Sequence, residues 1–137
     1  MSDPIKTAAV VVLKEDRVLL VRHGAKADHQ INTYGLPAGK VQLGEIERDA
    51  ALREFREETG LAAVAEDLLE IPKLYSATIQ QKEITKLFSM KVYKILHFTG
   101  TLKNSDETTP EWAKIVDLPS LNLLPNVALA IRDALQM

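Results

Sequence analysis

Three glutamates near the middle of the chain have the spacing of one helix face. Glu54, Glu57 and Glu58 lie in the string REFREE, residues 53–58. Each residue of an α-helix advances by about 100°, so the three carboxylates fall within an arc of roughly 100°. Glu54 and Glu58 are an i,i+4 pair of like charge, which destabilises an isolated helix by roughly 0.2–0.5 kcal/mol. We therefore expect a cation to lie against this face.

A hard divalent cation neutralises such a face better than a side chain does. Arg53 stands four residues before Glu57 and can orient it, but one guanidinium cannot balance three carboxylates. Magnesium takes carboxylate oxygens together with substrate phosphate oxygens and water. The pattern thus favours phosphate chemistry. The competing interpretation of the bare string is a solvated helix rich in Arg and Glu.

The residues around this string distinguish a metal-binding face from a solvated helix. Residues 39–61 read GKVQLGEIERDAALREFREETGL. The string resembles the Nudix box: Gly, five residues, Glu, seven residues, Arg-Glu, an apolar residue, any residue, Glu-Glu, any residue, Gly and an apolar residue. Seven positions demand one residue type, and at usages of about 6% a chance match at one start is of order 10⁻⁹ to 10⁻⁸. Phe55 stands where the family more often has an aliphatic residue, which concerns packing rather than chemistry.

The resemblance implies hydrolysis of a nucleoside diphosphate linked to another group, with Mg²⁺ as cofactor and Mn²⁺ as a substitute. It makes Glu57 and Glu58 the principal metal ligands. Glu54 is then a further ligand or the base that handles the attacking water. Gly39 is expected to offer its backbone carbonyl to the metal. Bridging cations are needed because a diphosphate repels nucleophiles until its charge is neutralised.

Other residues of the box are expected to support this site. Arg53 would hold a glutamate by a charge-assisted hydrogen bond, with Glu45 and Glu57 as candidates. Glu45 is accordingly interpreted as structural. Gly60 is also structural, because it stands where the cap of a helix over residues 46–58 belongs.

Two residues outside the box have counterparts in one subgroup of the family. The segment SDETTPEW, residues 105–112, resembles a loop of the eukaryotic oxidised-purine nucleoside triphosphatases, and this match singles out Glu107 over Glu111 as a fourth acidic residue. A solvated acidic loop is the alternative. Leu124-Pro125-Asn126 resembles the segment whose polar side chain reads the purine edge in that subgroup. Asn126 also suits a helix N-cap, and the two roles are compatible.

Aromatic and basic residues near these segments are further candidates. Tyr34 and Trp112 can stack on a base, although core packing is favoured for Trp112. Lys40 follows Gly39 and either meets a phosphate or remains exposed. His29 lies in a polar segment near the site, where an ordinary exposed histidine is the favoured interpretation.

Apolar and polar stretches alternate in a way that predicts an α/β fold. Strands are expected over residues 5–13 and 17–22, as a hairpin, and over 68–79 and 85–99, as another. A short strand is expected over 112–116, loops over 24–32 and 100–110, and a closing amphipathic helix over 126–135. With the box helix, this order predicts a Nudix-type α/β/α sandwich around a mixed sheet, forming a single domain over residues 1–137.

Composition limits the class of protein. The chain has 137 residues, no cysteine and a formal charge of −2 with dispersed basic residues, which argues against thiolate chemistry and against binding of duplex nucleic acid. The first apolar run is short and is followed by charged residues, so neither a signal peptide nor a membrane span is expected and cytoplasmic residence is the default. Whether the chain forms a homodimer is left open.

The leading functional hypothesis is a nucleoside triphosphate pyrophosphohydrolase that releases a monophosphate and pyrophosphate and clears oxidised purine nucleotides. The segment from Leu36 to Gly39 also resembles the ADP-ribose-cleaving subgroup, so ADP-ribose or a dinucleotide is the alternative substrate. A nucleotide-sensing module without turnover is an alternative from another class. Degenerate members of that kind usually lose box carboxylates, which this chain retains.

Overall fold

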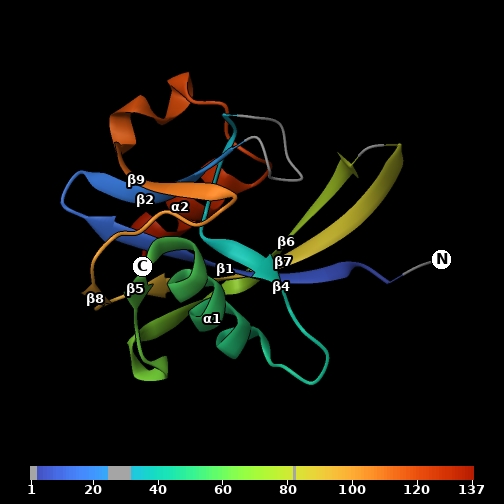
Figure 1. Ribbon diagram of the computed structural model, residues 1–137, viewed down its shortest axis with the longest axis horizontal. Helices are drawn as coiled ribbons and strands as arrows, with labels where there is room; N and C mark the ends of the chain where they lie inside the picture. Colours follow the sequence, from blue (N-terminus) through green and yellow to red (C-terminus); the bar gives the residue numbers. More distant parts are fainter. Residues whose placement is uncertain (1–2, 25–31, 82) are drawn as a thin grey trace.

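A computed structural model describes residues 3–24, 32–81 and 83–137, with the elements labelled in Figure 1. The main sheet has seven strands and contains both parallel and antiparallel pairs. Its central path runs β3-β2-β1-β7-β6, while β4 pairs with β1 and β9 pairs with β2. In chain order the strands are β1 (Ile5–Lys14), β2 (Arg17–His23), β3 (Tyr34–Gly35), β4 (Ala38–Lys40), β5 (Leu61–Ala62), β6 (Leu68–Gln81), β7 (Ile84–Ile95), β8 (Thr99–Gly100) and β9 (Thr108–Lys114).

Two helices cover opposite faces of this sheet, as Figure 1 shows. Helix α1 (Glu47–Thr59) packs on one face through Ala50, Ala51 and Phe55, together with Val10 of β1. Helix α2 (Val127–Leu135) packs on the other face, in the core cluster that contains its buried side chains and Val11. Successive residues of a strand point to opposite faces, which is why neighbouring valines of β1 serve different helices. The predicted α/β/α sandwich with a mixed sheet is confirmed.

Helix α1 lies within one residue of its predicted bounds because its signals are local. Glu47 and Asp49 occupy the first turn, where they suit the positive end of the helix dipole. The helix ends at Gly60, which has a left-handed φ of 80° and donates its N–H to the carbonyl of Arg56 at 2.9 Å. The backbone then enters β5, which pairs with β8 in a separate two-stranded sheet.

Strand β6 carries an irregularity that matters for the cavity described below. Glu70 pairs with Tyr93 and Leu74 pairs with Lys91, so three residues of β6 lie opposite one residue of β7. Pro72 lies in this bulge, where its missing N–H removes no ladder hydrogen bond. After the bulge, Tyr75 points into the core on the α2 face of the sheet.

Several strand boundaries differ from the sequence prediction. Strand β7 ends at Ile95 rather than at residue 99, and Thr99 belongs to the separate strand β8. Strand β9 begins at Thr108, inside the expected loop. Its residues from Thr108 to Lys114 pair with β2, and this long-range pairing cannot be predicted from the Thr-Thr-Pro sequence itself. The residues after it form a 3₁₀ helix, η2 (Ile115–Ser120), and a shorter one, η1 (Ala65–Asp67), precedes β6. Neither α1 nor α2 nor another helix in the described ranges has the length and apolar character needed to span a membrane.

Comparison of two left-handed glycines tests whether the close contact of the glycine that ends α1 contributes to stability. Gly44 and Gly60 both have φ of 80°, but a Cβ at Gly44 would meet nothing within 4 Å, whereas one at Gly60 would lie 2.6 Å from the carbonyl oxygen of Thr101. We predict that Gly44→Ala lowers the free energy of unfolding by about 1 kcal/mol and that Gly60→Ala lowers it by at least about 2 kcal/mol. Urea unfolding of both variants measures the difference. Equal losses would show that the contact with Thr101 is unimportant.

Candidate active site

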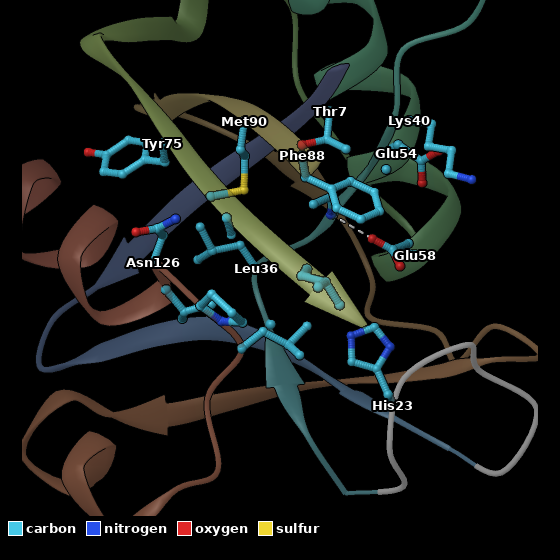
Figure 2. Close-up of a pocket in the computed structure, with 18 of the residues that line it drawn as sticks. Thr7, His23, Leu36, Lys40, Glu54, Glu58, Tyr75, Phe88, Met90 and Asn126 are labelled. Carbon is cyan, nitrogen blue, oxygen red and sulfur yellow. Dashed lines mark hydrogen bonds between the residues drawn. The ribbon is translucent and has the colours of Figure 1, made fainter. Parts of the chain in front are cut away.

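A cavity of about 340 Å³ opens between β4, the β6–β7 hairpin and the segment before α2. Figure 2 shows that it has two chemically different ends. Glu54, Glu58 and Lys40 lie at one end, while Tyr75 and Asn126 lie at the other. We call these the acidic end and the apolar end. Between and around them the wall is mainly apolar, with Leu36, Ala77, Ile79, Phe88, Met90, Leu124, Pro125 and Val127.

The last turns of α1 aim Glu54 and Glu58 at the turn that contains β4. The backbone N–H of Ala38 donates to the Glu58 carboxylate at 2.7 Å. Gly39 follows, and a Cβ at this position would collide with the carboxyl group of Glu54. The turn therefore approaches the helix this closely only because residue 39 has no side chain.

Arg53 binds the turn and the helix together. Its guanidinium donates to both oxygens of Glu45, through Nε at 2.9 Å and Nη2 at 3.0 Å. It also donates to Glu54 at 2.7 Å and to the carbonyl oxygen of Lys40 at 3.0 Å. Contact with Glu57 is longer, at 3.4 Å. Of the two partners expected for Arg53, Glu45 thus makes the bidentate pair, whose fork geometry is the strong form of this interaction.

Crowding of carboxylates governs the electrostatics of the acidic end. Burial, together with the negative charges of Glu54, Glu107 and Glu57, raises the pKa of Glu58 to about 8 against the lowering effect of the Ala38 N–H. Burial likewise raises the pKa of Glu54, against the lowering effect of Arg53. The carboxylates therefore repel one another where water screens them poorly, and a cation opposite them would relieve this repulsion.

The oxygen donors at this end fit a hard divalent cation. Within residues 3–24, 32–81 and 83–137, no three Asp, Glu or His side chains are already gathered around a metal-sized space. Glu54 and Glu58 line the cavity, whereas Glu57 is not among the lining residues and has 58% of its side chain exposed. Magnesium commonly takes one or two protein carboxylates and completes its shell with substrate phosphates and water. Glu54 and Glu58, the two α1 carboxylates that line the cavity, meet that requirement, and Glu57 directly precedes Glu58 in the helix.

The structure separates the two acidic candidates of the later loop. Glu107 lines the cavity, and its carbonyl oxygen accepts the N–H of Gly24 at 2.8 Å. Glu111 instead forms an ion pair with Arg22 at 3.0 Å and is not among the lining residues. Of the two, Glu107 thus lies at the cavity, and its role as a fourth acidic residue stays a prediction.

Asn126 lies at the apolar end, but its side chain does not cap α2. The residue directly precedes the helix with a left-handed φ of 69°, which asparagine tolerates better than most residues. Its Nδ2 donates to the carbonyl oxygen of Ser76 at 2.9 Å, and no side-chain cap bond forms. The predicted N-cap hydrogen bond is therefore wrong, because the left-handed backbone of Asn126 is not the extended conformation from which a side-chain oxygen accepts the first N–H groups of a helix.

The aromatic and basic candidates are divided between the cavity and the core. Lys40 is exposed and lines the acidic end. Tyr34 is not among the lining residues and packs against the α2-side core cluster. Trp112 packs against the α1-side core, with its ring centroid 6.0 Å from that of Phe98. His29 lies outside the described residues.

Sequence reasoning missed much of the cavity wall. His23, at the end of β2, is buried and lines the cavity, although the histidines look scattered in the sequence. Tyr75, Phe88 and Met90 also line it. Tyr75 is the register partner of Met90, and Phe88 pairs with Ala77. The period of two along both strands is the signal that would have placed these side chains on one face.

The sequence matches a known protein family over nearly its whole length. The family model described as "NUDIX domain" matches residues 3–136. The chain is 31% identical to the oxidized purine nucleoside triphosphate hydrolase of Mus musculus, over 85% of this chain and 70% of that protein. It is 29% identical to the ADP-ribose pyrophosphatase of Methanocaldococcus jannaschii, over 86% of this chain and 63% of that protein. The crystal structure of the MutT NUDIX hydrolase from Burkholderia pseudomallei superposes with a TM-score of 0.79 at 22% identity, covering 96% of this chain and 98% of that one.

The pair formed by Arg53 and Glu45 predicts a pH-dependent stability. The hydrogen bond from Arg53, with that from the Gln42 N–H, lowers the pKa of Glu45 from 4.5 to about 2. Because the folded-state pKa is the lower one, the stabilisation is complete above the unfolded value of about 4.3 and is lost as pH falls toward 2. We predict that Glu45→Gln is less stable than the natural protein by a gap that is constant from pH 5.5 to 7 and shrinks by pH 3.

Urea unfolding at pH 7, 5.5 and 3 measures this gap. Glu66→Gln, which changes an exposed carboxyl on η1, is the control, and we expect it to alter stability little at each pH. A Glu45→Gln gap as large at pH 3 as at pH 7 would contradict the assignment.

Proposed function

The chain belongs to the Nudix family, and from this premise we propose that it is a magnesium-dependent pyrophosphohydrolase that converts a nucleoside triphosphate into a monophosphate and pyrophosphate. The observation that carries the proposal is the continuity of the acidic end and the apolar end in one cavity. A nucleotide has the same division, because its phosphates are anionic and its base is largely apolar. Ligand cavities of this size and mixed lining are typical of small-molecule sites.

The box residues are assigned distinct tasks in this proposal. Glu57 and Glu58 are the principal ligands of Mg²⁺, with the backbone carbonyl of Gly39 as a further one. When bound, the metal neutralises the phosphate oxygens and lowers the pKa of a coordinated water. Arg53 fixes one oxygen of Glu54 at 2.7 Å, which supports a role for Glu54 as a ligand or as the base that accepts the proton of that water.

Residues outside the box are assigned to the substrate. Glu107 lines the cavity close enough to Glu58 for its charge to act on that carboxyl group, and it is the second candidate for handling the proton. Lys40 is available to the phosphates because it is exposed at the same end. Asn126 is proposed to contact the base at the apolar end. The position of Tyr34 on the core cluster gives no support to its proposed stacking role.

Oxidised purine nucleoside triphosphates are the proposed substrates. The resemblance around Glu107 and Asn126, together with the similarity to the mouse hydrolase, supports this choice. ADP-ribose is the second candidate. It is supported by the similarity to the archaeal ADP-ribose pyrophosphatase and by the resemblance of Leu36 to Gly39 to that subgroup. Mn²⁺ as a substitute metal, cytoplasmic residence and a homodimer stay predictions.

The role of the helix carboxylates is tested by neutralising them singly. We predict that Glu57→Gln and Glu58→Gln each lower magnesium-dependent kcat by at least about 100-fold, because each change removes negative charge that holds the cation. Glutamine at position 58 can still accept the Ala38 N–H, so the fold should persist. Asp49→Asn, an exposed change on the same helix, is the control and should keep full activity. Monophosphate release with and without magnesium is the measurement, and undiminished rates in both glutamine variants would refute the assignment.

The substrate and the site of attack are tested together. Oxidised dGTP, dGTP, CTP and ADP-ribose are incubated with the protein and magnesium in ¹⁸O water, and the products are identified by mass spectrometry. We predict the highest kcat/KM with oxidised dGTP and the appearance of monophosphate and pyrophosphate. Preference for ADP-ribose would favour the second candidate. Tight binding of a nucleotide without turnover would instead favour a sensing module.

A further inference from the structure

Helix α2 is fixed to strand β6 by side-chain hydrogen bonds at two positions seven residues apart, Asn126 and Asp133. At its start, Nδ2 of Asn126 donates to the carbonyl oxygen of Ser76 at 2.9 Å. Two turns later, Oδ2 of Asp133 accepts the hydroxyl of Tyr75 at 2.6 Å. Residues seven apart lie on one helix face and are separated by about 10 Å along its axis. Neighbouring residues of β6 thus hold both ends of one face of the helix.

Tyr75 connects this attachment to the cavity. Its side chain is 2% exposed, and its ring both lines the apolar end and belongs to the core cluster under α2. Its hydroxyl, by contrast, donates a hydrogen bond to Asp133, which is not among the lining residues. Figure 2 shows Tyr75 beside Met90 and above Asn126, on the side of the cavity away from Glu58.

The charge around Asp133 favours this hydrogen bond. Nζ of Lys73 lies 3.4 Å from Oδ2 of Asp133 and 5.2 Å from the centre of the Tyr75 ring. The hydrogen bond from Tyr75 lowers the pKa of Asp133, burial opposes this lowering, and the charge of Lys73 adds to it, so the pKa lies below its usual value. Asp133 is therefore an ionised acceptor near neutral pH, and a hydrogen bond to an ionised group is stronger than a neutral one.

The bulge of β6 explains why this contact is specific to Tyr75. Two extra residues between Glu70 and Leu74 shift the register just before the tyrosine. Tyr75 then faces the cavity and α2, opposite Met90, while the exposed Leu74 faces away. The position of the ring thus depends on a long-range hydrogen bond as well as on its strand.

We propose that Tyr75 and Asp133 are positioning residues for the nucleoside end of the substrate: their hydrogen bond fixes the tyrosine ring and, through α2, the distance between that ring and Asn126. The inference rests on the proposed function, because it assigns the nucleoside to the apolar end and the phosphates to the acidic end. Loss of the hydrogen bond should therefore weaken binding of the nucleoside part and leave the reacting phosphates undisturbed.

The test compares Tyr75→Phe with Lys94→Met. Phenylalanine keeps the ring and removes only the hydroxyl. Lys94 donates to the carbonyl oxygens of Ala134 at 3.0 Å and Met137 at 3.2 Å, so its loss loosens the far end of α2 without touching the cavity. The readouts are KM, kcat and the inhibition constant of inorganic pyrophosphate with magnesium, using whichever of oxidised dGTP, dGTP, CTP or ADP-ribose is turned over best.

We expect Tyr75→Phe to raise KM about tenfold, with kcat and the pyrophosphate inhibition constant each changed less than about twofold. Lys94→Met should leave all three nearly unchanged even where it lowers the melting temperature. Asp133→Leu should reproduce the KM of Tyr75→Phe, and the double variant should add little to either. Asp133→Asn keeps an acceptor and should recover part of the affinity.

Several outcomes would overturn the inference. An unchanged KM in Tyr75→Phe, an equal KM increase in Lys94→Met, or a parallel loss of pyrophosphate inhibition would each show a merely structural role. Where the natural protein binds a nucleotide without turnover, its Kd replaces KM and decides in the same way. If it neither hydrolyses nor binds any nucleotide of the panel, the proposed function fails and the inference fails with it. If the protein is an active enzyme and Tyr75→Phe leaves KM unchanged, the inference fails while the proposed function stands.

Discussion

Keeping like charges together in a partly buried place is the constraint on which the rest of the structure depends. Glu54 and Glu58 lie one helical turn apart against the backbone of residues 38 and 39, where burial opposes their ionisation. Such an arrangement is costly unless hydrogen bonds and opposite charges compensate. Arg53 supplies part of this compensation, because it connects Glu54, Glu45 and the carbonyl of Lys40 in one network.

The shape of the turn follows from the same constraint. Residue 39 must be glycine because the carboxyl group of Glu54 occupies the space of its side chain. The glycine at position 60, with its left-handed backbone, redirects the chain into β5 at the other end of α1. The two glycines of the box are therefore explained by steric requirements, and the acidic residues between them by charge. The shape of this turn and helix and the charge of the acidic end thus have their main determinants in the same 23 residues, 39–61.

The parts of the structure that the sequence predicts are those with local causes. Helix α1 was placed within one residue because its spacing, its acidic first turn and Gly60 are all readable within 14 positions, 47–60. The bounds of β9 were not predicted correctly, because its threonines and Pro110 form a strand only by pairing with β2, about 90 positions earlier in the chain. The missing cap bond of Asn126 was not predictable either, since it depends on the left-handed backbone before α2, and the partner of the amide, Ser76, is 50 residues away.

This difference between local and long-range causes divides the cavity as well. The acidic end is built almost entirely from one continuous segment, so its geometry is retained as long as that segment keeps its sequence. The apolar end combines β6, β7 and the start of α2, and contacts between distant segments such as that of Tyr75 with Asp133 hold it together. If the nucleoside binds at the apolar end as proposed, substitutions there alter which nucleoside fits while the carboxylates stay in place.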